Sequence, residues 1–279
     1  MKLSVTAALE ASETAPILLR GNIFESINAA LSIGFDSMEI HLRCASDVDG
    51  AKIKEHCSEK HFCISTIGTG MAYVIDKLSL TDSDRWVRKK TVQRLLEHVD
   101  LADKLDCAVI IGSIKGRTQH TNDHDLSVKH CLEGIREVAE YAGGKGVFLF
   151  IEPINRYELN YLNTVEETIL FLDQTKMTNI KILIDTFHMN IEETNLEKSI
   201  SMCGNKLGHV HLADSNRRHP GAGHLNFKSI INKLHQVRYG EFAAFECLPY
   251  PDAITAATRG LEYIKMINEK ICQNRGKVE

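Results

Sequence analysis

Four residues in the second half of the chain have side chains that could bind one metal ion. They follow one another at intervals of about one strand–helix unit, each near the end of a short apolar run: Glu152, Asp185, His211 and Glu246. Three carboxylates and one imidazole form a mainly oxygen-donor set, which suits hard divalent cations better than a thiolate-rich set would. The pattern predicts a site for one divalent ion, with Mn²⁺ as first choice and Co²⁺, Mg²⁺ or Zn²⁺ as alternatives.

Each of these residues also has an ordinary structural interpretation when taken alone. Asp185 could cap a following turn, either glutamate could pair with an arginine, and His211 could be a hydrogen-bonded core histidine. Their shared position in four consecutive units favours the metal site, because a cation neutralises carboxylates that would otherwise repel one another. His209 shares a strand face with His211 but lies one layer deeper, so we expect it to support the site or the core.

The elements that must position these residues are short apolar, β-branched runs that recur along the whole chain. The eight runs are residues 3–9, 37–42, 62–68, 108–113, 147–153, 181–186, 207–214 and 241–248. Amphipathic stretches with helical periodicity lie between them, among them "IFESINAALSIG" and "NFKSIINKLHQV". Eight alternating strand–helix units in a chain of 279 residues are typical of a parallel (β/α)8 TIM barrel, an α/β fold.

The competing architecture is an open, doubly wound parallel sheet. Such sheets commonly carry a glycine-rich first turn, and "LSVTAALEAS" contains no GxGxxG. No Pro/Gly-rich linker or low-complexity segment interrupts the sequence, so we predict a single barrel domain over residues 1–279. In a parallel barrel the functional residues gather at the carboxyl ends of the strands, which would place all four candidate ligands on one rim.

The composition excludes several classes of partner. A net charge of -4 gives no attraction to nucleic acid or to an anionic membrane surface. We find neither a signal-peptide pattern nor an apolar run approaching the ~18 residues that a membrane span needs. The eight cysteines are scattered and form no CxxC pair, which predicts reduced thiols and a cytoplasmic location.

The chain resembles the ketose 3-epimerase family in four segments of matching order and spacing: "EPINRYE" (152–158), "DTFHMNIEE" (185–193), "HVHLADSNRRHPGAGH" (209–224) and "FEC" (245–247). This family of D-tagatose and D-psicose 3-epimerases belongs to the xylose isomerase-like TIM barrels. The resemblance implies one divalent metal ion on the same four candidate ligands. It also implies that Glu158, His188 and Arg217 contact the oxygens of a ketose, and that the chain forms a homo-oligomer, a dimer or a tetramer.

Epimerisation beside a ketone removes a carbon-bound proton and returns one to the opposite face. A divalent ion can stabilise the enediolate between these steps, and two carboxyl groups, one on each face, can serve as base and acid. Glu152 and Glu246 come from the first and last strands of the ligand-bearing half, and both the chemistry and the resemblance assign the proton transfers to them. His188 and Arg217 would steady the oxyanion, and Glu158 would orient a hydroxyl or His188.

The expected substrate is a small ketose or keto-sugar acid. Familiar sugar epimerases place aromatic residues in the first strand and after the fourth, where this chain has "SVTAALE" and "GSIKGR". The segments "IGTGMAY" and "IIGSIKGR" are more similar to a branch that includes 5-keto-L-gluconate epimerase. We therefore hypothesise that Lys115, Arg117 and Arg217 ring the mouth and bind a carboxylate or phosphate; the alternative is that Lys115 and Arg117 are solvated loop charges.

Three other functions fit parts of the pattern. An aldose–ketose isomerase acting on a sugar or a sugar phosphate could share the metal site and the enediolate step. An apurinic endonuclease of the same superfamily would need further histidines at the ends of the third and fourth strands, where the chain has "TIGTG" and "IIGSI". A non-catalytic sugar-binding barrel would need no pair of carboxylates on opposite faces of one carbon.

Overall fold

Eight parallel strands form a closed barrel in the computed structural model, which describes residues 1–118 and 124–275. Each barrel strand pairs with its neighbour in the sequence, and the last pairs with the first. The strands are β1 (Lys2–Ala8), β3 (Ser37–His41), β4 (Cys63–Gly68), β5 (Ala108–Ile111), β6 (Leu149–Ile151), β7 (Ile180–Asp185), β8 (Leu207–His211) and β9 (Phe242–Phe245). A two-residue strand, β2 (Leu19–Arg20), pairs with the end of β1. The predicted (β/α)8 TIM barrel is confirmed.

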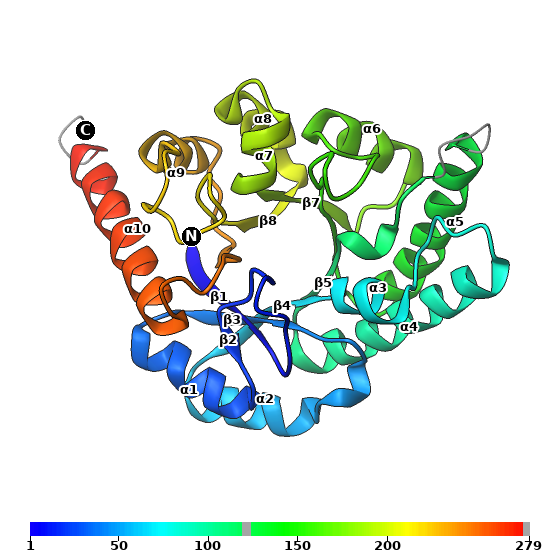
Figure 1. The fold of residues 1–279 in the computed structure, drawn as a ribbon, viewed down its shortest axis with the longest axis horizontal. Coiled ribbons are helices and arrows are strands. Elements are labelled where there is room, and N and C mark those ends of the chain that lie inside the picture. Colours follow the sequence, from blue (N-terminus) through cyan, green and yellow to red (C-terminus); the bar gives the residue numbers. More distant parts are fainter. Residues whose placement is uncertain (119–123, 276–279) are drawn as a thin grey trace.

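Helices surround the strands, as Figure 1 shows. They are α1 (Ile23–Ile33), α2 (Gly50–Glu59), α3 (Gly70–Asp76), α4 (Arg85–Leu105), α5 (His124–Gly143), α6 (Val165–Thr175), α7 (Thr186–Glu192), α8 (Leu196–Cys203), α9 (Phe227–Gln236) and α10 (Ala253–Arg275). Three short 3-10 turns cover Ala45–Asp47, Ser113–Lys115 and Gly204–Lys206. The two stretches in which helical periodicity was noted, "IFESINAALSIG" and "NFKSIINKLHQV", correspond to α1 and α9.

Local sequence signals explain where these helices begin and end. The Asn22 side chain accepts hydrogen bonds from the first backbone amides of α1, and Gly34 ends that helix with a left-handed φ of 102°. At α6, Thr164 and Glu167 form a reciprocal capping box. Capping residues therefore fix both ends of α1 and the start of α6.

The hydrophobic core has two parts. The larger part lies between the strands and the helices. A small separate cluster of Ala108, Ile110, Phe150 and Leu183 fills the barrel interior. The Phe150 ring stacks on His209 at a centroid distance of 5.8 Å, so this cluster lies directly below the polar residues at the carboxyl ends of the strands.

No helix within residues 1–118 and 124–275 is both long and apolar enough to cross a membrane. All eight cysteines are among the described residues, and their thiols are free. The expectation of reduced cysteines therefore agrees with the structure.

Candidate metal centre and active site

The four predicted metal ligands meet at one rim of the barrel. Glu152 directly follows β6, Asp185 and His211 are the last residues of β7 and β8, and Glu246 directly follows β9. Because parallel strands end on the same side, their terminal side chains converge. One ligand atom from each residue lies within 4.8 Å of the others, and all four side chains are buried.

One atom of each ligand has no hydrogen-bond partner. These atoms are Glu152 Oε1, Asp185 Oδ2, His211 Nδ1 and Glu246 Oε2. The imidazole Nδ1 lies 3.6 Å, 3.8 Å and 3.5 Å from the three carboxylate oxygens, in that order. Buried polar atoms are normally paired, so four atoms that lack a protein partner and lie close together fit a shared metal ion. Three oxygens and one nitrogen fit a divalent cation of the Mn²⁺ class.

The electrostatics of the metal-free site agree with this assignment. Burial and the nearby Glu246 carboxylate raise the pKa of Asp185 well above its usual value. Burial alone would lower the pKa of His211, but the carboxylates of Glu39 and Glu246 raise it well above its usual value. Without a cation the site therefore retains protons that a bound divalent ion would displace.

Asp185 has a second, structural role that explains why "DTFH" follows β7. Its Oδ1 atom accepts hydrogen bonds from the amides of Phe187 (2.6 Å) and His188 (3.3 Å), capping α7. The cap uses one carboxylate oxygen and leaves Oδ2 facing the other ligands. The two interpretations of Asp185, helix cap and metal ligand, therefore hold for two different atoms of one side chain.

A glycine makes room for Glu152. A Cβ atom built on Gly112, just after β5, would lie 2.4 Å from Glu152 Oε2. Any side chain at position 112 would have to displace the Glu152 carboxylate, so the glycine is needed here for space.

His188 is held beside the ligands in a defined orientation. It is buried, and Asn155 Nδ2 donates a hydrogen bond to its Nδ1 atom at 2.7 Å. Because an amide nitrogen can only donate, the neutral ring must carry its proton on Nε2, which lies 3.9 Å from Glu152 Oε1. Burial and the positive charge of Arg217 lower the pKa of His188 well below its usual value. His188 is therefore a neutral hydrogen-bond donor at the edge of the site.

Arg217 and Glu158 form an ion pair over the site. Arg217 Nη1 donates to Glu158 Oε1 at 2.8 Å, and the guanidinium lies 4.8 Å from the centroid of the Phe187 ring. The backbone of Arg217 is left-handed, with a φ of 59°. Burial lowers the pKa of Arg217, but Glu246 and Glu158 more than compensate. Asn155 also donates to Glu158, which links this pair to His188.

The structure corrects the expected ring of three cations at the mouth. Lys115 is fully buried, and its ammonium donates to the backbone carbonyl of Glu152 at 2.8 Å. Burial lowers the pKa of Lys115 to about 8. The short 3-10 turn that contains Lys115 directs the side chain inward, where this carbonyl satisfies it. Lys115 therefore cannot join a ring of exposed cations at the mouth, whereas Arg117 is exposed and Arg217 lies over the ligands in its ion pair with Glu158.

A family model described as "Xylose isomerase-like TIM barrel" matches residues 27–267. The chain belongs to this xylose isomerase-like family. A D-psicose 3-epimerase of Agrobacterium fabrum is 32% identical over 220 residues, which cover 76% of this chain and 75% of the relative. A 3-dehydro-D-guloside 4-epimerase of Escherichia coli is 32% identical over 242 residues, covering 81% and 87%.

Solved structures agree with the xylose isomerase-like assignment. The crystal structure of a D-allulose 3-epimerase from Methylomonas sp. superposes with a TM-score of 0.80 at 25% identity, covering 96% of this chain and 98% of the other. The curated relatives are epimerases, and this xylose isomerase-like barrel is accordingly an enzyme of the isomerase class.

Two functional positions in this xylose isomerase-like barrel were missed by sequence reasoning. Asn155, inside "EPINRYE", orients His188. Glu39, in the middle of β3, lies against His209 and His211. The signal for Glu39 was present: "SMEIH" places Glu39 and His41 on the same face of a strand that is otherwise apolar enough to be buried.

Proposed function

We propose that the chain is a divalent-metal-dependent epimerase that inverts the hydroxyl-bearing carbon next to the ketone of a ketose or keto-sugar acid. The observation that carries this proposal is the convergence of four unpaired ligand atoms, two of them from glutamates, beside a neutral histidine donor. The named relatives, which include ketose 3-epimerases and a keto-sugar 4-epimerase, support the reaction class.

Each side chain of the site has a role in this reaction. When bound, a divalent cation supplies positive charge that stabilises the oxygens of an enediolate. Glu152 and Glu246 extend from β6 and β9, which are separated by two strands along the rim. One carboxylate removes the proton from the carbon beside the ketone, and the other, as a carboxylic acid, returns a proton to the opposite face. The substrate loses and regains one proton, so the reaction needs no redox cofactor.

The remaining groups bind and orient the sugar. The Nε2 proton of His188 is available to a substrate oxygen, and Arg217 adds positive charge where the oxyanion develops. Glu158 holds the Arg217 guanidinium and has a second oxygen for a sugar hydroxyl. We assign Mn²⁺ as the first-choice ion, with Co²⁺, Mg²⁺ and Zn²⁺ as alternatives, because carboxylate–histidine sites accept several divalent metals.

The surroundings favour a substrate that does not rely on aromatic stacking. The end of β1 and the segment after β5 are the regions where familiar sugar epimerases carry aromatic walls. Here they hold Ala8 and residues 112–117, none of which is aromatic, so binding relies more on polar contacts with the sugar oxygens. An acidic group on the substrate would bind at Arg217, because the buried Lys115 ammonium already donates to the Glu152 carbonyl.

The test is a panel of ketoses, keto-sugar acids and sugar phosphates incubated in D₂O with Mn²⁺. An epimerase exchanges the hydrogen on the carbon beside a retained ketone, which NMR detects directly. An aldehyde product would instead indicate an aldose–ketose isomerase. The endonuclease alternative has less support, because β4 and β5 lead into Gly68 and Gly112 rather than into histidines.

Variants then test the two glutamates. Turnover of Glu152→Gln and Glu246→Gln at saturating Mn²⁺ should fall by about 10²–10⁴-fold, because each loses a proton-transfer group. Glu166→Gln, at an exposed position in the first turn of α6, is the matched control and should retain full turnover. Wild-type turnover in either site variant would reject the assignment of the acid–base pair.

A further inference from the structure

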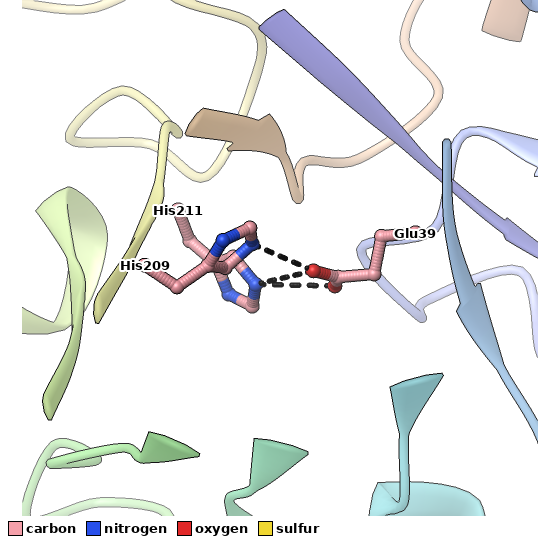
Figure 2. A group of neighbouring side chains, drawn as sticks. All are labelled: Glu39, His209 and His211. Carbon is pink, nitrogen blue, oxygen red and sulfur yellow. Dashed lines mark hydrogen bonds and ion pairs between the residues drawn. The ribbon is translucent and has the colours of Figure 1, made fainter. Parts of the chain in front are cut away.

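A second buried cluster, which surrounds the carboxylate of Glu39, lies beside the proposed metal centre and shares His211 with it. Figure 2 shows Glu39 with two of its partners, His209 and His211. Glu39 is fully buried on β3. Three imidazole Nε2 atoms approach it: His41 at 2.7 Å, His209 at 2.9 Å and His211 at 3.1 Å. The Thr66 hydroxyl donates a fourth hydrogen bond. The donors come from β3, β4 and β8, so the cluster spans the barrel.

The hydrogen-bonding capacity of this carboxylate is filled. An ionised carboxylate accepts about four hydrogen bonds and donates none. The two oxygens of Glu39 are surrounded by the Thr66 hydroxyl and three imidazole nitrogens, an arrangement that fits an acceptor-only carboxylate. Each histidine that contacts Glu39 must therefore present a proton on Nε2.

This requirement determines which nitrogen of His211 is available to a metal ion. A neutral imidazole carries one proton, and if that proton is on Nε2, the lone pair is on Nδ1. Nδ1 is the His211 atom that has no hydrogen-bond partner and lies 3.5–3.8 Å from the oxygens of the other ligands. The opposite tautomer would leave the Nε2 lone pair facing the Glu39 carboxylate, which is repulsive.

We propose that Glu39 is a positioning residue that fixes the tautomer and the ring orientation of His211, so that Nδ1 is presented to the divalent ion. The inference rests on the metal site of the proposed function. A ligand histidine commonly donates its second ring N–H to a carboxylate, and the loss of such a partner typically weakens metal binding. The chain supplies this partner from β3, 172 residues away in sequence from His211.

Glu39, His209 and His211 could alternatively hold a second ion, because their polar atoms also lie within 4.8 Å of one another. Hydrogen bonding argues against this. The Nε2 atoms of His209 and His211 and the Glu39 oxygens are already paired with each other, whereas the atoms of the main cluster are unpaired. A hydrogen-bonded support and an ion-binding cluster therefore lie side by side and share His211.

The experiment compares metal binding in the wild type, Glu39→Gln and Glu166→Gln by titrating metal-free protein with Mn²⁺ in a calorimeter. We expect Glu39→Gln to bind Mn²⁺ about 10–100-fold more weakly, because an amide cannot accept from three imidazoles. Glu166→Gln, the same substitution at an exposed position in α6, is the matched control and should bind Mn²⁺ with wild-type affinity.

A spectroscopic measurement reads the His211 ring directly and does not depend on the Glu39 variant folding. In ¹⁵N-histidine-labelled wild-type protein loaded with diamagnetic Zn²⁺, and assigned by comparison with His211→Gln, NMR should show Nδ1 coordinated and Nε2 protonated. Coordination through Nε2 would overturn the proposal. In a folded Glu39→Gln protein with weakened binding, the Nε2 proton signal should lose its hydrogen-bonded shift.

The outcomes separate this inference from the proposed function. A wild-type protein that binds neither Mn²⁺ nor Zn²⁺ would remove the metal centre and the proposed mechanism with it. A wild type that binds one ion tightly, alongside a Glu39→Gln variant that binds equally tightly, would overturn only the role of Glu39. Two ions per chain would replace the hydrogen-bonded support with a second metal site and would also overturn the inference.

Discussion

Replacing Asp185 with asparagine separates the cost of clustered negative charge from the benefit of metal binding. The ligand atoms of Glu152, Asp185 and Glu246 lie within 4.8 Å of one another. At that distance, and with an effective dielectric constant near 20, each pair of ionised carboxylates repels by about 3.5 kcal/mol or more. Asparagine removes the charge but retains the Oδ1 atom that caps α7, so the local backbone should be preserved.

The metal-free Asp185→Asn protein should be more stable than metal-free wild type. The substitution removes two of the three repulsive pairs, and the positive charges of His211 and Arg217 offset part of that repulsion in the wild type. We therefore expect a net gain of about 1–3 kcal/mol at high pH, comparable to other replacements of buried charges by neutral groups. For a chain of this size, that corresponds to roughly 2–3 °C in Tm per kcal/mol.

The stability advantage of metal-free Asp185→Asn over metal-free wild type should increase with pH. The pKa of Asp185 is raised in the folded, metal-free protein, so the folded state retains a proton that the unfolded chain has lost. Wild-type stability therefore falls as pH rises above the usual carboxyl pKa toward the raised one. The amide of the variant does not titrate, so its advantage should be small at low pH, where Asp185 is protonated in both states of the wild type, and should grow with pH.

The assay is urea unfolding at several pH values, with EDTA or with Mn²⁺. A concentration of Mn²⁺ about 100-fold above its Kd should stabilise the wild type by about 2.7 kcal/mol, and most of this gain should be lost in the variant, which lacks one ligand. A metal-free variant that is less stable than wild type at every pH would refute the repulsion argument. Full retention of the Mn²⁺ effect would refute the assignment of Asp185 as a ligand.

Two further predictions concern residues around the ligands. Gly112→Ala should lower the affinity for Mn²⁺ at least about 10-fold in calorimetry, because the new Cβ atom would lie 2.4 Å from Glu152 Oε2. An unchanged affinity would mean that the Glu152 carboxylate can move without weakening metal binding. Burial lowers the pKa of Lys115 in the folded protein to about 8. Between this pH and the usual lysine pKa, the unfolded chain binds more protons than the folded protein, so the stability of the wild type should rise with pH. The total gain over this range should be up to about 3 kcal/mol. In urea unfolding, the stability of Lys115→Met should not rise over this pH range. An identical pH dependence in the two proteins would show that the pKa of Lys115 is not lowered in the folded state.

The positions of the ligands could be predicted because barrel strands repeat along the chain. A charged residue at the end of a buried strand costs free energy unless a partner such as a metal ion compensates it. Four successive strands that end in this way indicate a shared site at the rim where their carboxyl ends meet. Glu152, Asp185, His211 and Glu246 each follow this rule, and the structure brings them together. Strand and helix positions were predictable for the same reason, since alternation and helical periodicity reflect which face each residue buries.

Lys115 shows where this reasoning fails. A lysine after a strand, in "GSIKGR", is typical of a solvated loop charge or an anion-binding residue, and nothing local indicates that its ammonium will be enclosed. Its burial depends on a carbonyl of Glu152, just after the next strand, which accepts its hydrogen bond at 2.8 Å. A buried lysine is tolerated only if such a partner exists, and that partner is visible only in three dimensions.

The amino-acid sequence by itself predicted the barrel architecture and the four positions that converge at the rim, because these follow from strand periodicity. The class of ion stays a prediction from the chemistry of the donors. The tertiary structure alone decided which atom of each ligand is free, that Asn155 orients His188, and that Glu39 contacts His211 across the barrel. The reason is physical: hydrogen-bond partners, tautomers and burial depend on atoms that closure of the barrel brings within about 3 Å of one another, from residues that lie far apart in the chain.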